Sequence, residues 1–173
     1  TAQQKKKRAN SVLKPSKELI PIKGISLKMR SKLEEINIMD ISTLLSRCNT
    51  QNKRDKLAEE LEIAPEYVNS WVKQADLWRV EYMTTDMAFM LVQIGVRSVD
   101  DLSKVDSNKA YPILKSVSLT IPEYDLESKS YLDKLIGSAK DIVESSLDLI
   151  KLKENINGIL DLQNVDVDVN VNL

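Results

Sequence analysis

The stretch Pro65–Val80, with the sequence PEYVNSWVKQADLWRV, decides how the rest of the chain is organised. Proline suits the first turn of a helix, where its missing N–H group would have no partner in any case. The apolar residues that follow recur at the spacing of one helical face: Val68, Trp71, Val72 and Ala75. This pattern predicts a helix that closes one structural unit and leads the chain into the next.

Both tryptophans of the chain, Trp71 and Trp78, lie in this stretch. They are separated by about two helical turns and therefore fall on roughly the same side of the helix. Large aromatic side chains dominate the burial of apolar area in protein cores. We therefore expect both to anchor a core, and the alternative for Trp78 is a place on a binding surface.

The sequence around this helix is repeated. The segment Leu33–Ile41 resembles Leu91–Val99, 58 residues later, and Ile63–Tyr67 resembles Thr120–Tyr124, 57 residues later. Two matches at nearly one period indicate an internal duplication. The fold expected is all-α, with a first repeat over residues 15–78 and a second repeat over residues 79–143.

Polar residues that favour helix starts divide these repeats into short helices. Each stands just before an apolar periodic segment, where its side chain can accept a hydrogen bond from a free helix amide. The predicted caps are Ser26, Asp40, Thr50, Thr84 and Ser98. Gly95 is expected to end the helix that begins after Thr84, because glycine readily adopts the left-handed conformation found at helix ends.

A longer helix is expected from about Leu126 to Leu152, and residues 144–163 are predicted to form the continuation of this C-terminal helix. Its apolar residues cover more than one face, so several sides should be buried. Packing within the chain explains one part of this pattern, and a partner helix or a second copy of the chain explains another. The segment Asn155–Gly158 is expected to break the helix.

The last segment, residues 164–173, alternates strictly between apolar and polar residues, which is the period of a β-strand. Its apolar positions are Val165, Val167, Val169, Val171 and Leu173. A lone strand leaves its backbone groups unpaired, so the segment is either disordered or pairs with a strand of a partner protein. The alternating Asp and Asn residues do not make a calcium loop, which requires a glycine and a glutamate at fixed positions.

Composition limits the possible functions. The chain has 173 residues, a formal net charge of −1, one cysteine and no histidine. Without histidine, the commonest general base and metal ligand is missing, and Cys/His zinc sites are excluded. Cys48 shares an apolar face with Leu44 and should be buried. No metal, cofactor or catalytic group is expected, no apolar run is long enough to span a membrane, and we expect the protein to be cytoplasmic.

Charge is unevenly distributed along the chain. Residues 1–14 form a basic arm that contains four consecutive cations: Lys5, Lys6, Lys7 and Arg8. After Lys153, every charged side chain is acidic. A basic arm suits a phosphate backbone or an acidic protein groove, so the two ends of the chain should meet different neighbours.

Several motifs resemble helix-hairpin-helix domains. The sequence is most similar to a bacterial family of unknown function built from two degenerate copies of that motif. The residues that carry the likeness lie between about Leu19 and Val143, and they are Ile22–Ser26 followed by Leu33, Trp71–Leu77 with Arg79–Val80, and Ala88 with Ile94–Val96.

This resemblance implies a phosphate contact. Helix-hairpin-helix proteins hold DNA through backbone amides of a glycine-rich turn at the start of a helix. In the first copy the corresponding residues are Lys23, Gly24, Ser26, Lys28 and Arg30. The second copy reads Tyr82–Met83–Thr84 with acidic neighbours, so it should repel phosphate. Alternatively, both hairpins are only corners of the fold.

Two functions follow as hypotheses. The first is a non-catalytic adaptor or structural component that docks into a larger protein assembly by its basic arm, long helix and C-terminal strand. The alternative is a nucleic-acid-binding module that contacts phosphates without reading sequence. A binding affinity that falls steeply with salt concentration would distinguish phosphate binding from docking on an apolar surface.

Overall fold

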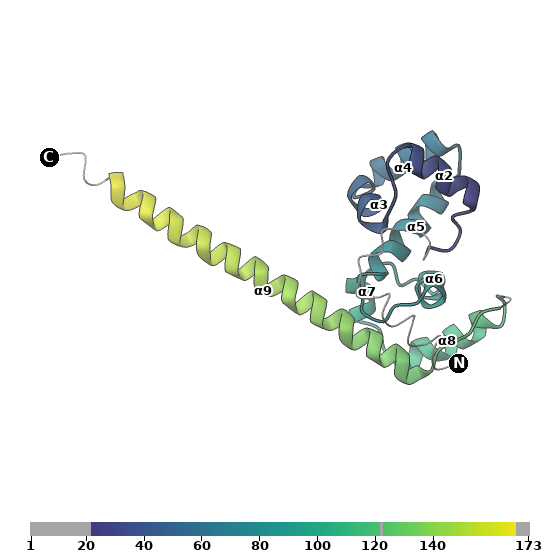
Figure 1. Cartoon of the computed structure of the whole chain (residues 1–173). Helices are drawn as coiled ribbons and strands as arrows, with labels where there is room; N and C mark the ends of the chain where they lie inside the picture. The colour runs from purple at the N-terminus through teal and green to yellow at the C-terminus, as the bar shows by residue number, and fades with distance from the viewer. Residues whose placement is uncertain (1–21, 122, 169–173) are drawn as a thin grey trace, which may run out of the picture.

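A computed structural model describes residues 22–121 and 123–168 (Figure 1). This part of the chain is all-helical, as predicted, and contains eight helices and no strand. The helices are α2 (Leu27–Glu35), α3 (Ile41–Arg47), α4 (Gln51–Leu61), α5 (Pro65–Leu77), α6 (Thr85–Gln93), α7 (Val99–Ser103), α8 (Ser107–Ser118) and α9 (Lys129–Asp168).

Local sequence explains where these helices begin. The side chains of Ser26, Asp40, Thr50, Thr84 and Ser98 each accept a hydrogen bond from an amide in the first turn of the helix that follows, as predicted. Helix α5 has Pro65 in its first turn, also as predicted. Gly95, just beyond α6, has a φ of +94°, a conformation that glycine adopts without steric cost.

The body of the molecule has two hydrophobic cores. The first is built by α2 to α5 and contains buried residues from Ile22 to Ala75. The second is built by the end of α5, by α6 to α8 and by the start of α9, and it contains buried residues from Leu77 to Ala139. Helix α5 therefore serves both cores and lies at the centre of the body (Figure 1).

The tryptophans of α5 divide between these cores. Trp71 is 2% exposed and belongs to the first core, which confirms its prediction as a core anchor. Trp78 is partly buried and packs against the second core. The lone cysteine, Cys48, is fully buried in the first core, as predicted.

Polar side chains of α5 fix the adjoining segments. The buried Gln74 amide donates to the carbonyl of Lys23 at 3.0 Å and accepts from the N–H of Lys23 at 2.9 Å. Asp76 accepts from the N–H of Val99, the first residue of α7, at 2.8 Å, and its other oxygen pairs with Arg79. Since α5 holds the turn before α2 and the start of α7, it fixes the geometry of both cores.

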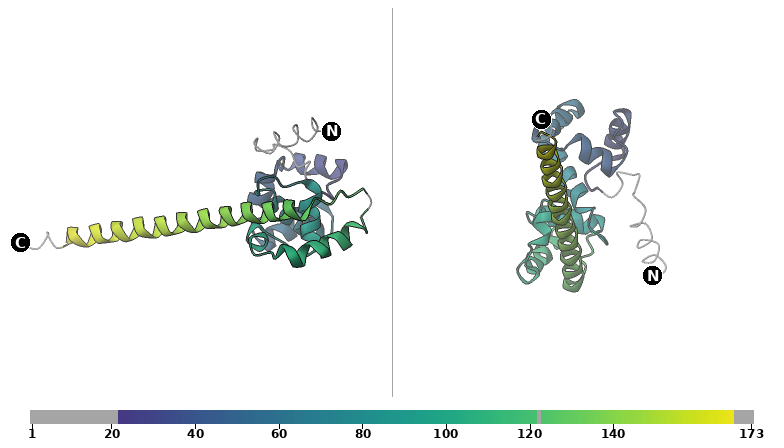
Figure 2. Two further views of the ribbon diagram at one scale, coloured as in Figure 1. Left: turned by 90° about the horizontal axis from the view of Figure 1, so that it is seen from below. Right: turned by 90° about the vertical axis from the view of Figure 1, so that its left-hand side faces the viewer.

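Helix α9 is the longest element, with 40 residues and a length of about 60 Å. Near its start, Leu132, Leu135 and Ala139 are fully buried in the second core. From Glu144 to Asp161 every residue is exposed, and the helix extends away from the body (Figure 2). Among the described residues, no helix combines the length and apolar character needed to cross a bilayer.

Two predictions about the C-terminal region are wrong. Residues 155–158 do not break α9, because an interior glycine costs only about 1 kcal/mol relative to alanine and the flanking residues favour the helix. Val165 and Val167, predicted to lie in a strand, belong to the end of α9, where a helix pairs its own backbone groups and a lone strand does not. The other predicted strand positions, Val169, Val171 and Leu173, lie outside the described residues.

Candidate docking surface

The exposed half of α9 concentrates large aliphatic side chains on the surface. Among the side chains that the structure describes, twelve large hydrophobic residues are exposed, and seven of them lie on this helix, each between 47% and 60% exposed: Leu147, Leu149, Ile150, Leu152, Ile156, Ile159 and Leu160. The remaining five are scattered over other elements. Isolated exposed apolar residues are normal in soluble proteins, but contiguous ones mark interaction surfaces.

Five of these residues share one side of the helix and form what we term the apolar stripe: Leu149, Leu152, Ile156, Ile159 and Leu160. Their separations of three, four and one residues place them along a single face. Complete burial of a large aliphatic side chain contributes about 1.5–3 kcal/mol, so covering these half-exposed residues would contribute on the order of 5 kcal/mol.

Charged residues occupy the opposite side of the same segment. Glu144, Lys151 and Glu154 are exposed there, and Asp161 follows them. None of these side chains forms an ion pair with another described residue. Leu147 and Ile150 are also exposed on that side, so the charged side is mixed, and the apolar stripe is the longer continuous apolar face of the segment.

A groove lies where α9 leaves the body. Its volume is about 370 Å³, and its walls come from the end of α5, the start of α7 and α9. Asp76, Arg79 and Asp100 supply polar atoms, whereas Ile142 and Leu147 supply apolar surface from α9. The groove therefore continues the exposed apolar surface of α9 onto the body.

The first hairpin is engaged with the rest of the body. Lys23 forms an ion pair with Asp86 of α6, and its ammonium group lies 5.6 Å from the centre of the Phe89 ring. Gly24 has a φ of +93°, and a Cβ atom at this position would lie 3.3 Å from Nε1 of Trp71. The glycine is therefore required for the close approach of the turn to α5, apart from any contact with phosphate.

The other predicted phosphate-binding residues meet at the start of α2. Ser26 caps this helix by accepting from the N–H of Met29 at 3.2 Å, Lys28 is exposed, and Arg30 is partly buried. The Nε atom of Arg30 is buried and has no hydrogen-bond partner. Ser26, Lys28 and Arg30 thus lie at the start of α2, where Lys28 and Arg30 point to different sides of the helix, and Lys23 is directed toward α6. The predicted basic arm, Lys5 to Arg8, lies outside the described residues.

The second hairpin is a corner of the fold. Tyr82 has a φ of +67°, in the left-handed region that residues other than glycine rarely adopt. The hydroxyl of Tyr131 in α9 donates to the carbonyl of Tyr82, and the ammonium group of Lys134 lies 3.8 Å from the centre of the Tyr82 ring. Burial raises the pKa of Tyr131, so its hydroxyl stays protonated as a donor. These contacts attach the hairpin to the start of α9.

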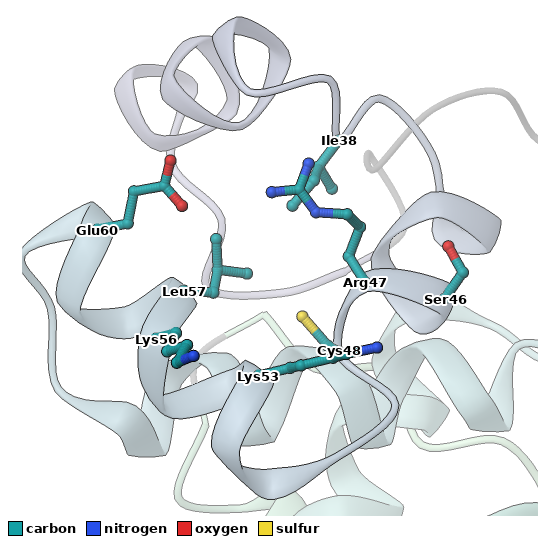
Figure 3. Close-up of a pocket in the computed structure, with 8 residues that line it drawn as sticks. All are labelled: Ile38, Ser46, Arg47, Cys48, Lys53, Lys56, Leu57 and Glu60. Atoms are coloured by element: carbon teal, nitrogen blue, oxygen red, sulfur yellow. The ribbon is translucent and has the colours of Figure 1, made fainter.

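A shallow depression of about 380 Å³ lies over the first core, between α3 and α4 (Figure 3). Arg47, Lys53 and Lys56 surround it, with Cys48 beneath. The guanidinium of Arg47 already donates to the carbonyl of Ile36 at 2.8 Å, and burial raises the pKa of the Cys48 thiol. A protonated, buried thiol is a poor nucleophile, so Cys48 is not activated for covalent catalysis.

The described residues contain no group of three or more side chains of the metal-binding types that could hold an ion. The main surface feature that sequence reasoning missed is the outer part of the apolar stripe, Ile156, Ile159 and Leu160, because a helix break was expected at Gly158. Their spacing from Leu149 and Leu152 is the signal that would have found them.

Comparison with protein families gives one match. Residues 23–120 match a family model described as Domain of unknown function (DUF4332). No curated protein and no solved structure matches the chain. The matched range contains α2 to α8 and ends before α9, so the helix that carries the apolar stripe lies beyond it.

Proposed function

The chain belongs to the family of the Domain of unknown function (DUF4332), and from this premise we propose that it is a non-catalytic adaptor of the cytoplasm. In this proposal it joins a larger protein assembly by placing the apolar stripe of α9 against a helical partner. The two cores, which the sequence relates to helix-hairpin-helix repeats, act as the scaffold that holds α9.

One observation carries this proposal: the exposed segment of α9 presents the apolar stripe without cover from any residue that the structure describes. A helix that projects into water gains nothing from tertiary packing, which supplies most of the stability of helices in proteins. Contact with a partner would supply the burial that the chain itself does not provide there. The family match does not extend to α9, so this role is proposed for this chain and not for the family.

The proposal is tested with variants of the stripe. The tagged full chain, the double variant Leu152→Lys with Ile156→Lys and the control Glu154→Lys serve as baits in the same cell extract. We expect at least one protein to bind the wild type and the control but to be reduced at least tenfold with the double variant. The control introduces the same positive charge on the opposite side of the helix. Identical sets of bound proteins for all three baits would contradict the proposal.

Nucleic-acid binding is a second candidate, and the start of α2 favours it. This helix has no acidic residue in its first turn, where Lys28 and Arg30 accompany the positive end of the helix dipole. The ion pair between Lys23 and Asp86 weakens the case, because it removes one cation from the predicted site.

This candidate predicts phosphate binding that depends on salt. Retention of DNA or RNA by the full chain should fall steeply between low and moderate salt, and the variant Lys28→Glu with Arg30→Glu should abolish it. Fluorescence anisotropy with a labelled duplex and a labelled single strand measures both effects. Unchanged retention by this variant would eliminate the first hairpin as a nucleic-acid site.

A further inference from the structure

The apolar stripe has the spacing of a coiled-coil seam. If Leu149 is given position a of a heptad, Leu152 falls at d, Ile156 at the next a and Ile159 at the next d. All four side chains are about half exposed. Apolar residues at consecutive a and d positions are the pattern by which helices pair side by side in water.

Two residues beside this seam carry complementary charges. Asp148 occupies position g and Lys153 occupies the following position e, and both are exposed. Neither forms an ion pair within the described part of the chain. In a parallel two-stranded coil, a residue at g lies beside the residue at the next e of the other helix. Two identical chains would therefore form two Asp148–Lys153 pairs across the seam.

We propose that α9 pairs in parallel and in register with α9 of a second copy of this chain. The seam consists of Leu149, Leu152, Ile156 and Ile159, and Asp148 and Lys153 flank it. Leu160, the remaining member of the apolar stripe, falls at the second position e and extends the apolar face beside the outer heptad. This inference rests on the proposed function, since it names the partner of the same helix face.

Charge favours the parallel arrangement over the antiparallel one. An antiparallel pair that overlaps the whole stripe would place Leu149 opposite Ile159 and Leu152 opposite Ile156. Lys153 would then lie close to Lys153 of the other copy, and like charges beside a seam destabilise it. The parallel arrangement replaces this repulsion with two attractive pairs.

The surface area that the stripe can bury determines how stable the dimer should be. Covering the stripe on both copies would remove roughly 1,000 Å² of surface from water, just below the 1,200–2,000 Å² of stable specific interfaces. The dimer should therefore be weak and depend on protein concentration.

Mass measurements on the purified full chain test self-association. Light scattering across a concentration series should show the mass rising from one chain toward two for the wild type and for the control Glu154→Lys. The variant Ile156→Lys should remain at the mass of one chain at every concentration. Ile156 is about half exposed in the single chain, so this variant should fold normally, and circular dichroism checks that it does.

Oxidative cross-linking tests the orientation. Leu149→Cys and Ile156→Cys, made separately, should each give a covalent dimer, because identical positions face one another in a parallel, in-register pair. An antiparallel pair would cross-link at most one of them. The wild type under the same oxidation provides the baseline, since Cys48 is buried. Asp148→Lys and Lys153→Asp should each weaken the dimer several-fold, and the two changes together should restore it.

The outcomes separate this inference from the proposed function. A wild type that stays a single chain at all concentrations, with neither cysteine variant cross-linked, overturns the second copy as partner. If the bait experiment still shows binding that depends on the stripe, the adaptor proposal stands with a different partner. If that binding is also absent, both fail.

Discussion

Replacing Trp71 by alanine should lower the free energy of unfolding by about 3–5 kcal/mol, the range typical of deleting a buried large aromatic side chain. Trp71 is 2% exposed, and its indole lies against the turn at Gly24. The substitution removes apolar contacts and leaves a cavity that the rigid turn cannot fill. Against a total stability of about 5–15 kcal/mol, this loss would leave the protein marginally folded.

Urea denaturation followed by circular dichroism measures this effect without depending on tryptophan fluorescence. Tyr67→Ala is a matched control, because Tyr67 is an aromatic residue on the same helix but is 57% exposed. The control should change the free energy of unfolding by no more than about 0.5 kcal/mol. Equal losses for both variants would mean that α5 does not hold the first core through Trp71.

The second large effect concerns two leucines of α9. Leu135→Ala should lower the free energy of unfolding by about 2–5 kcal/mol, because Leu135 is fully buried in the second core. In dilute protein, Leu152→Ala should change it by no more than about 0.5 kcal/mol, because Leu152 is 55% exposed.

Leu135→Ala and Leu152→Ala are the same substitution at two positions of one helix. The difference in helix propensity between leucine and alanine therefore cancels when the two changes in unfolding free energy are compared. Urea denaturation at low protein concentration gives both values. Similar losses at the two positions would show that the chain itself covers the stripe, contrary to the extended α9 described above.

Local features were predictable from the sequence. The five helix caps and Pro65 act on amides only a few residues away, so their signals are contained in short windows. Burial of Cys48 and Trp71 followed from the period of apolar residues. The same period also indicated that α9 carries more apolar surface than one body-facing side needs.

Contacts between distant residues were not predictable in this way. The pairing of Gln74 with Lys23 spans 51 residues, and that of Asp76 with Val99 spans 23. Neither leaves a periodic signal, because each depends on how two segments meet in space. The ion pair of Lys23 with Asp86 is of the same kind, and it changes the meaning of a lysine that the sequence alone associated with phosphate.

The errors near the C-terminus have a different origin. Alternating valines suit a strand, but residues 165–168 extend an existing helix, and each added residue gains a hydrogen bond without a new nucleus. Gly158 was expected to stop α9, yet the cost of one glycine is small beside the propagation of the flanking segment. In both places, propagation of the existing helix outweighed the local preference for a strand or a break.

The most direct measurement of the adaptor proposal is a photo-cross-linking scan along residues 147–161 of the full chain in cells. A photoreactive residue is placed at each position in turn, and cross-linked products are counted. We predict strong products at Leu149, Leu152, Ile156 and Ile159, and weak ones at Lys151, Glu154 and Gly158, because only the apolar stripe meets a partner. Products without this helical period, or none at any position, would contradict the proposal that α9 is a docking element.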